Sequence, residues 1–413
     1  MEQTNLKVYG HRWLILLAFM FIAGMNQMTW ITFAPITSKA VEFFGLKSDL
    51  MVSLLSMSFM AVGILLVIPA AWVIDTWGFR VAVGIGAALT GFFAMTRGIF
   101  AHNFSLVFAS QIGLAVAQPF ILGAITKLAA RWFPVKERAT AAGLGTLSTY
   151  LGIMAAMIIT PPLTLELGIP GMLLAYGVAS LVAAFFFLFV ARERPPTSPA
   201  FAGVDDRVLM FEGLKRVLRQ RDFIFLLIIF FFGLGAFNAI STWIEVIVHP
   251  RGFSIAQAGM AGGLMLIGGI CGAIAMPILS DTFHRRKPFM ITALAGVIPG
   301  LIGMTFATNY WLLLASGFIF GFFLLGSGPI GFQYAAEITR PAPEGTSNSL
   351  LLAMGQISGI IFIFGMDALK APGTGVMTNS LLGQAGLIVL SLILVMFLRE
   401  SPILASSRKI EQL

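Results

Sequence analysis

IDTWGFR, at residues Ile74 to Arg80, returns about half of the 413-residue chain later as SDTFHRR, at Ser280 to Arg286. In both copies an aromatic residue follows an Asp-Thr pair, and an Arg stands five residues after the Asp. A second pair of similar segments, PVKERAT from Pro134 and PAPEGTS from Pro341, has nearly the same separation. Two matches at nearly the same separation indicate an internal duplication, which many membrane transporter folds contain.

The composition predicts an integral membrane protein. The chain is 58% hydrophobic and 11% charged, with a mean hydropathy of +0.92, whereas soluble proteins carry about 25% charged residues. The first ten residues are polar and the apolar block after them is long enough to span a bilayer, so we expect no cleavable signal. The single cysteine, Cys271, excludes a disulfide framework within one chain.

The apolar segments predict an all-α fold of twelve transmembrane helices in two halves. The predicted spans are 12–37, 50–74, 80–100, 104–132, 138–162, 170–191, 222–248, 255–279, 287–307, 310–338, 346–367 and 379–398. We expect an N-terminal six-helix half at 1–191 and a C-terminal half at 222–413. Residues 192–221 carry Pro-rich and charged stretches with apolar residues at helical spacing, which predicts a linker with an amphipathic helix on the membrane surface.

The Lys and Arg residues predict the orientation. Most of the 26 fall at the termini, in the 192–221 linker and in the two Asp-Thr loops, which would share one side of the membrane. Because basic residues favour the cytoplasmic side, we expect a multi-pass cell-membrane protein with both termini cytoplasmic. This architecture resembles the major facilitator superfamily, and the resemblance covers the whole chain. We expect a monomer with the bilayer and a small-molecule substrate as its partners.

Polar side chains inside apolar spans are costly unless they face a cavity or another helix, so they are the candidates for a substrate site. Trp30 follows Asn26 by four residues and shares its helix face, although a Trp is also common as an interfacial anchor. Gln118 lies near the middle of the fourth span. In the seventh span Asn238 and Glu245 belong to one polar stripe that also contains Ser241 and Thr242.

Several motifs resemble the feline leukaemia virus subgroup C receptor family of carriers, which are associated with choline, ethanolamine and haem. They are NQMTWITFAP, GLAVAQPFILG, RWFPVKERATA, GAFNAIST, GQISGIIF and, most specifically, the string from Glu337 to Ser347. The resemblance implies substrate contacts by Trp30, Gln118 and Gln356. Where the family has a Tyr, this chain has Asn238, so it lacks one aromatic wall of the implied substrate site.

The resemblance and the residue chemistry together predict a carrier of a small organic cation or amine. A family Asn falls on Thr149, a second substitution in the implied site. A quaternary ammonium is recognised by aromatic faces, which Trp30 and either Phe237 or Trp243 would supply. Gln118 would accept a hydrogen bond from a hydroxyl or ammonium group, as would Gln356. With Asn in place of Tyr, the substrate is expected to form more hydrogen bonds than choline, as a primary amine or amino alcohol does.

The sequence also offers candidates for ion coupling and for a structural latch, which would hold the cytoplasmic ends of the helices together. Glu245 and Glu337 are possible coupling or gate residues, and Glu337 is expected to pair with Arg340 or Arg131. The structural latch residues of the two loops are Asp75 with Arg80 and Asp281 with Arg286. Because no buried carboxylate pair is evident, we expect uniport driven by the membrane potential.

Other functions have less support in the sequence. No catalytic or metal-binding cluster and no nucleotide-binding loop stand out, so we expect no enzyme, no cofactor, no metal and no nucleic-acid partner. A proton-coupled carrier of an organic anion, vitamin or haem-related compound is the alternative. Arg97 and Lys127 would anchor an anion, although both also fit side chains that reach out to the membrane surface. A receptor that does not transport is the third possibility.

Overall fold

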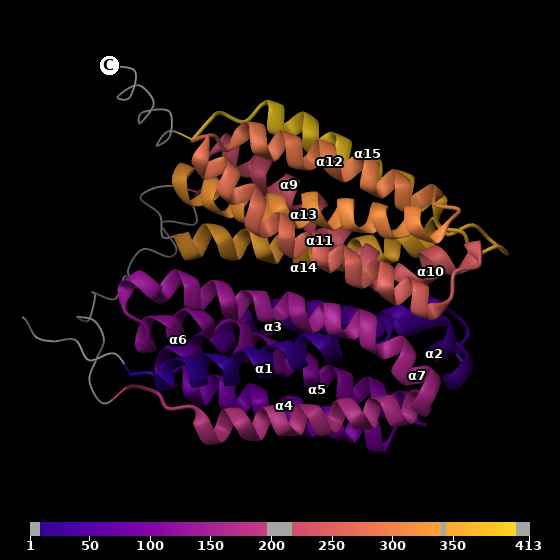
Figure 1. Cartoon of the computed structure of the whole chain (residues 1–413), viewed down its shortest axis with the longest axis horizontal. Coiled ribbons are helices and arrows are strands. Elements are labelled where there is room, and N and C mark those ends of the chain that lie inside the picture. Colours follow the sequence, from indigo (N-terminus) through magenta and orange to yellow (C-terminus); the bar gives the residue numbers. More distant parts are fainter. Residues whose placement is uncertain (1–8, 196–216, 340–343, 402–413) are drawn as a thin grey trace, which may run out of the picture. The chain divides into compact units, whose positions relative to one another are not determined.

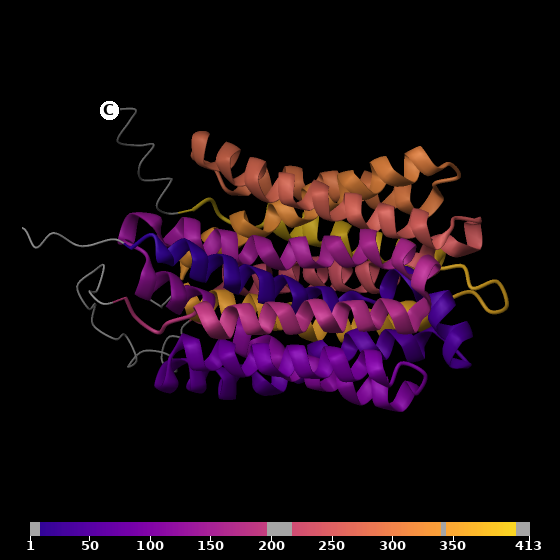
Figure 2. The ribbon, with the colours of Figure 1, turned by 60° about the horizontal axis from the view of Figure 1, so that its bottom comes forward.

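The computed structural model describes residues 9–195, 217–339 and 344–401 (Figure 1). The chain divides into two compact units, Met1–Val204 and Asp205–Leu413, and all regular structure in the described residues is helical. In each unit the helices run side by side as a bundle (Figures 1 and 2). The predicted amphipathic linker helix falls almost entirely on residues 196–216, which lie outside the described part.

The first unit is a bundle of six spans. It contains α1 (His11–Ile31), η1 (Ala34–Ile36), α2 (Thr37–Phe44), α3 (Asp49–Trp77), α4 (Phe79–Ile99), α5 (Phe104–Leu122), α6 (Ile125–Trp132), η2 (Val135–Glu137) and α7 (Arg138–Val190). The long α7 is two spans, because Gly168 interrupts it with φ 68° and ψ 174°. A positive φ of this kind is costly for any residue with a Cβ atom, which explains the glycine at this turn.

The second unit repeats this arrangement. It contains α9 (Arg221–Thr242), α10 (Ile244–Val248), η4 (His249–Arg251), α11 (Ile255–Thr282), α12 (Lys287–Phe306), α13 (Tyr310–Ile338), α14 (Glu344–Ala368) and α15 (Thr378–Met396). In each unit we call the end that carries the Asp-Thr pair the Asp-Thr end, and the opposite end the distal end.

The structure confirms the twelve predicted spans. Eleven helical segments in the described residues are long and apolar enough to cross a membrane, and the broken α7 supplies two spans. Three predicted spans are interrupted. The first turns at Thr32 and Phe33, the fourth divides between α5 and α6, and the seventh divides at Trp243. The breaks do not change the number of crossings.

The same pairs of helices pack in both units, which supports the duplication. In the first unit α3 and α4 pack on α5, and α7 packs on α1 and α4. In the second unit α11 and α12 pack on α13, while α14 packs on α9 and α15 on α12. Each unit therefore has its own core, built from helices in equivalent order.

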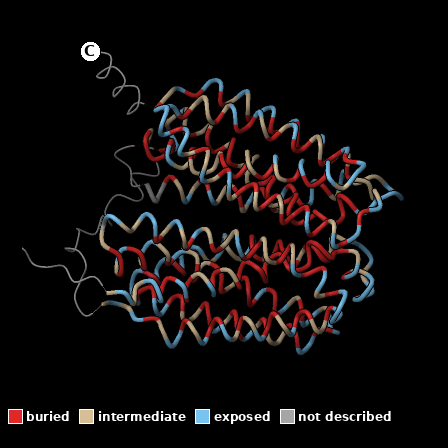
Figure 3. The backbone as a smooth tube through the Cα atoms, in the orientation of Figure 1, coloured by how far each residue is buried: buried red, intermediate tan, exposed pale blue. Residues whose placement is uncertain are grey.

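Burial follows the pattern of a bundle in lipid (Figure 3). Buried residues lie between helices, whereas many large apolar side chains are exposed, such as Phe189 at 85% and Ile68 at 77%. A soluble protein rarely exposes apolar surface so extensively. These faces fit contact with lipid tails.

Glycines allow the closest helix contacts. A Cβ added at Gly152 of α7 would lie 2.1 Å from the carbonyl oxygen of Gly24 in α1. In the second unit, Cβ atoms at Gly268 and Gly272 of α11 would meet the backbone of α13. The Gly-rich run at 262–272 therefore packs helix against helix.

The α1–α7 contact gives a direct test of this packing. We expect Gly152→Ala to destabilise the protein by about 1–3 kcal/mol, because the new methyl group would collide with backbone that cannot rotate away. Gly143→Ala on the same helix is the matched control, since a Cβ there has no neighbour within 4 Å. Thermal unfolding of the purified variants in detergent measures both. Equal melting temperatures would contradict the packing.

Candidate functional site

Trp30 lies in the last turn of α1 and is only 6% exposed. Its indole Nε1–H donates to the carbonyl oxygen of Ser56 in α3 at 3.0 Å. No aromatic ring or cation stacks on the Trp30 ring among the described residues. This burial does not fit an interfacial anchor, and the faces of the ring are not taken by another π or cationic group.

Gln118 is buried, and like Trp30 it faces α3. Its Oε1 lies 3.7 Å from the position of a Cβ on Gly63 of α3. Gly63 follows Ser56 by two helical turns, or about 10 Å along α3, so both positions share one helix face. The structure therefore brings Trp30 and Gln118 to one side of α3.

The structure places Asn26 and Thr149 differently. Asn26 is fully buried, and its Nδ2 donates to Thr90 Oγ1 at 3.3 Å and to the Leu114 carbonyl at 3.2 Å. It ties α1 to α4 and α5, so its position fits helix packing better than the predicted substrate contact. Thr149 is half-buried, and its hydroxyl donates to the Thr146 carbonyl of its own helix.

In the second unit Asn238 of α9 bonds to the backbone of α14 next to Gln356. The Nδ2 of Asn238 donates to the carbonyl oxygen of Gly355 at 3.0 Å, and Gln356 is the next residue. A Cβ at Gly355 would collide with Leu234, so the helices approach closely here. Phe237 is buried on the same helix as Asn238.

Trp243 and Glu245 are both buried in the second unit. The Nε1–H of Trp243 donates to the Ile363 carbonyl at 3.2 Å, and the Lys370 ammonium lies 5.9 Å from the ring centroid. Trp243 is therefore engaged by the protein itself. Glu245 is 1% exposed, so it is not a solvated residue here, and its role in coupling or gating stays a prediction.

Trp30 and Gln118 belong to the first unit, whereas Asn238 and Gln356 belong to the second. Their convergence on one cavity stays a prediction. Within each unit, the two residues lie where helices of that unit contact each other.

Arg97 and Lys127, the possible anion anchors, both bind helix C-termini. The Nη1 of Arg97 donates to the Thr29 carbonyl of α1 at 3.1 Å, and the Lys127 Nζ donates to the Ile74 and Asp75 carbonyls of α3. Arg97 is fully buried, so it does not reach out to the membrane surface.

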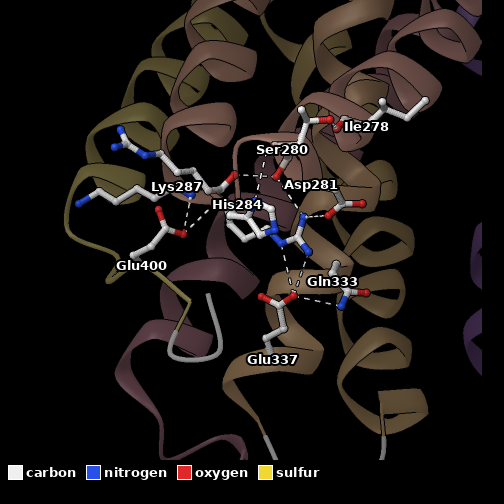
Figure 4. A network of polar contacts seen from close by, with 11 residues as sticks. Ile278, Ser280, Asp281, His284, Lys287, Gln333, Glu337 and Glu400 are labelled. Atoms are coloured by element: carbon white, nitrogen blue, oxygen red, sulfur yellow. Dashed lines mark hydrogen bonds and ion pairs between the residues drawn. The ribbon is translucent and has the colours of Figure 1, made fainter. Parts of the chain in front are cut away.

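At the Asp-Thr end of the second unit, Arg286 joins the carboxylates of Asp281 and Glu337, both of which are labelled in Figure 4. It forms an ion pair with Asp281 and another with Glu337 at 3.0 Å, and Gln333 donates to the same Glu337 oxygen at 3.1 Å. Burial lowers the pKa of Arg286, but the hydrogen bonds and charges of Glu337 and Asp281 outweigh it, so this pKa is raised overall. The guanidinium therefore stays protonated.

These contacts give two carboxylates partners that the sequence did not indicate. Glu337 pairs with Arg286, while its predicted partner Arg340 lies outside the described residues and a contact with Arg131 of the other unit stays a prediction. The exposed Asp75 carboxylate pairs with Lys127 of α6 at 3.7 Å.

Sequence reasoning missed a third repeated feature, an Arg-Glu pair after the last span of each unit. The Glu193 carboxylate accepts from the Arg80 amide at the start of α4, and the Glu400 carboxylate accepts from the Arg286 amide before α12, both at 2.8 Å. A carboxylate at a helix N-terminus offsets the helix dipole. The signal was present in the sequence, since the two Arg-Glu pairs have the same separation as the other repeats.

No group of His, Cys, Asp and Glu side chains in the described part of the chain could hold a metal ion. The arrangement consists of aromatic and amide groups at helix contacts and of charges at helix ends.

Comparison with known proteins agrees with this architecture. A family model described as Major Facilitator Superfamily matches residues 15–363 and 247–412. The bacterial homolog of the human lysosomal transporter Spinster, in an inward-facing occupied conformation, has a TM-score of 0.73 at 16% identity and covers 94% of this chain and 97% of its own. The D-xylose-proton symporter has a TM-score of 0.73 at 14% identity, covering 94% of this chain and 98% of its own. These matches and the duplicated bundle define a major facilitator transporter.

Curated relatives narrow the assignment. Solute carrier family 49 member A3 of Xenopus tropicalis is 30% identical over 90% of this chain and 80% of the relative. The choline/ethanolamine transporter FLVCR2 of Homo sapiens is 30% identical over 87% of this chain and 72% of the relative. Within the major facilitator superfamily, the chain belongs to the family of the feline leukaemia virus subgroup C receptors.

The two ion pairs of Arg286 should differ in strength. The Glu337 side chain is 5% exposed and the Asp281 side chain 66%. Removing one partner of a buried pair costs about 3 kcal/mol, whereas an exposed pair contributes up to about 1 kcal/mol. We expect Glu337→Gln to lower the thermal unfolding midpoint clearly more than Asp281→Asn does. An equal decrease for both variants would show that burial does not rank these pairs.

Proposed function

We propose that this transporter moves a small organic cation or amine by alternating access, as a uniporter driven by the membrane potential. It works in the cell membrane with both Asp-Thr ends on the cytoplasmic side, where Arg12, Lys127 and Arg138 fit the usual excess of basic residues. The substrate site contains Trp30, Gln118, Asn238 and Gln356.

The observation that carries the proposal is the state of the Trp30 ring. It is held at its Nε1–H by Ser56, and no described ring or cation stacks on its faces. A cation over a Trp face gains roughly 0.5–1 kcal/mol when exposed and about 2 kcal/mol when desolvated. The relatives that transport choline and ethanolamine carry substrates of this kind, as their names state.

The amide groups favour a substrate with N–H or O–H donors. Asn238 donates through Nδ2 to Gly355, which leaves its Oδ1 as an acceptor. A primary ammonium can donate to such an oxygen, whereas a quaternary ammonium has no N–H. Ethanolamine-like compounds therefore fit better than choline.

The charges argue against an organic anion. An anion would need free cations, but Arg97 and Lys127 already donate to helix carbonyls. Proton coupling has one specific observation in its favour, because the buried Glu245 lies on the α10 segment at the distal end of a span. Buried carboxylates within membranes often move protons.

Uptake into proteoliposomes tests the proposal. Purified protein should accumulate labelled ethanolamine when a potassium gradient with valinomycin makes the interior negative, because a potential of 100 mV supplies about 2.3 kcal/mol, equivalent to roughly fifty-fold accumulation. A pH gradient without a potential should produce no accumulation.

Each arm of this experiment decides between the alternatives. Accumulation driven by the pH gradient alone would favour the proton-coupled carrier and contradict uniport. No uptake of ethanolamine or choline under either gradient, by protein that is folded and inserted, would overturn the proposed substrate class. Protein-free liposomes with the same gradients provide the background.

Position 238 should set the preference between amines. Asn238→Tyr would supply an aromatic face and remove the amide acceptor, so we expect the ratio of choline affinity to ethanolamine affinity to rise about five-fold or more. Asn238→Leu is the control, because it removes the acceptor without supplying a strong cation–π face. Competition binding with both amines measures the ratio. A ratio that changes equally in the two variants would contradict the role given to the ring.

A further inference from the structure

The break that follows Trp30 leaves helix carbonyls in need of donors. α1 ends at Ile31, and the chain turns through Thr32 and Phe33 into η1. Pro35 has no N–H, so it cannot donate to the Ile31 carbonyl as a continuing helix would. The last turn of a helix needs outside donors for its carbonyls, and this turn contains Trp30.

Arg97 of α4 and Gln111 of α5 supply donors. Arg97 donates through Nη1 to the Thr29 carbonyl at 3.1 Å and to Gln111 Oε1 at 2.6 Å, and through Nη2 to Thr32 Oγ1 at 3.3 Å. Gln111 Nε2 donates to the Thr29 carbonyl at 3.2 Å and to the Trp30 carbonyl at 3.3 Å. Both side chains are fully buried.

Arg97 and Gln111 hold the backbone of the helix turn that carries Trp30. The Trp30 carbonyl is held by Gln111, while the indole Nε1–H is held by the Ser56 carbonyl. The two contacts come from different helices, α5 and α3. Together they determine where the ring lies at the end of α1.

The charge of Arg97 is directed at the helix and not at a substrate. A cation at a helix C-terminus interacts favourably with the negative end of the helix dipole. The guanidinium also lies 5.7 Å from the centroid of the Phe33 ring, which adds a cation–π contact. The buried Arg97 is thereby accommodated by one helix carbonyl, an amide, a hydroxyl and a ring.

We propose that Arg97 and Gln111 are positioning residues that set the affinity for the organic cation by holding Trp30, without touching the substrate. The inference rests on the proposed function, in which Trp30 supplies the cation–π face. Binding groups must be held within about 0.5 Å of their productive positions, so the residues that fix Trp30 should contribute to affinity.

The second unit supplies a matched control. Arg251 caps the C-terminus of α12 by donating through Nη1 to the Met304 carbonyl at 2.7 Å and to the Thr305 and Ala307 carbonyls at 3.2 Å. It therefore performs the same chemistry on a helix that does not carry Trp30. A Lys at either position keeps the charge and loses the planar fork of donors.

The experiment compares ethanolamine binding by Arg97→Lys and Arg251→Lys, using the intact protein in detergent, together with the KM and maximal rate of uptake. We expect Arg97→Lys to weaken binding and raise KM about five-fold or more, with a smaller effect on the maximal rate. Arg251→Lys should bind like the parent even if its melting temperature falls. Gln111→Met, which keeps the side-chain length and removes the donors, should weaken binding in the same direction.

Trp30 variants separate this inference from the proposed function. Trp30→Ala should lose about 1–2 kcal/mol of binding, which is five- to thirty-fold in affinity, and Trp30→Phe should retain part of it. If both Trp30 variants bind like the parent, the proposed function of Trp30 is wrong. If they bind weakly while folded Arg97→Lys and Gln111→Met bind normally, only the positioning role is wrong. If Arg97→Lys does not fold, Gln111→Met alone decides.

Discussion

Backbone groups at a helix end inside a membrane must find partners within the protein, because lipid tails offer none. In this chain, charged side chains of neighbouring segments are the partners of several helix ends. Their charges have the sign that the helix dipole requires. The cations Arg97, Lys127 and Arg251 donate to the C-termini of α1, α3 and α12. The carboxylates of Glu193 and Glu400 accept from amides at the N-termini of α4 and α12. One of these contacts, that of Arg97, lies at the break of the first span.

This constraint also explains which residues are left for the substrate. Arg97 and Lys127 have the charge that an anion carrier needs, yet both are engaged in holding helix ends. Aromatic and amide groups remain, above all Trp30 and Asn238, and they suit a small cation with hydrogen-bond donors. The Asp of the Asp-Thr pair has a different cationic partner in each unit. Asp75 pairs with Lys127, whereas Asp281 pairs with Arg286, which also binds Glu337.

The spans and the duplication could be predicted from the sequence, because apolar length and repeated motifs are properties of the chain itself. Partners across helices could not. Asp75 pairs with Lys127, and Asn26 packs against α4 and α5, because the neighbouring helices decide these contacts. The capping role of Arg97 depends on where α1 ends. The sequence does not show that end, because the apolar pattern continues through it. The Arg-Glu pairs at Glu193 and Glu400 were visible as a repeat, although their role required the structure.

An experimental structure with bound ethanolamine tests the central claim most directly, which is that charges close the helix ends and leave Trp30 for the substrate. Electron cryo-microscopy should show ligand density against the indole face of Trp30, with Arg97 still bound to the Thr29 carbonyl. Ligand density elsewhere, or an Arg97 guanidinium that has left α1 to contact the ligand, would contradict the account.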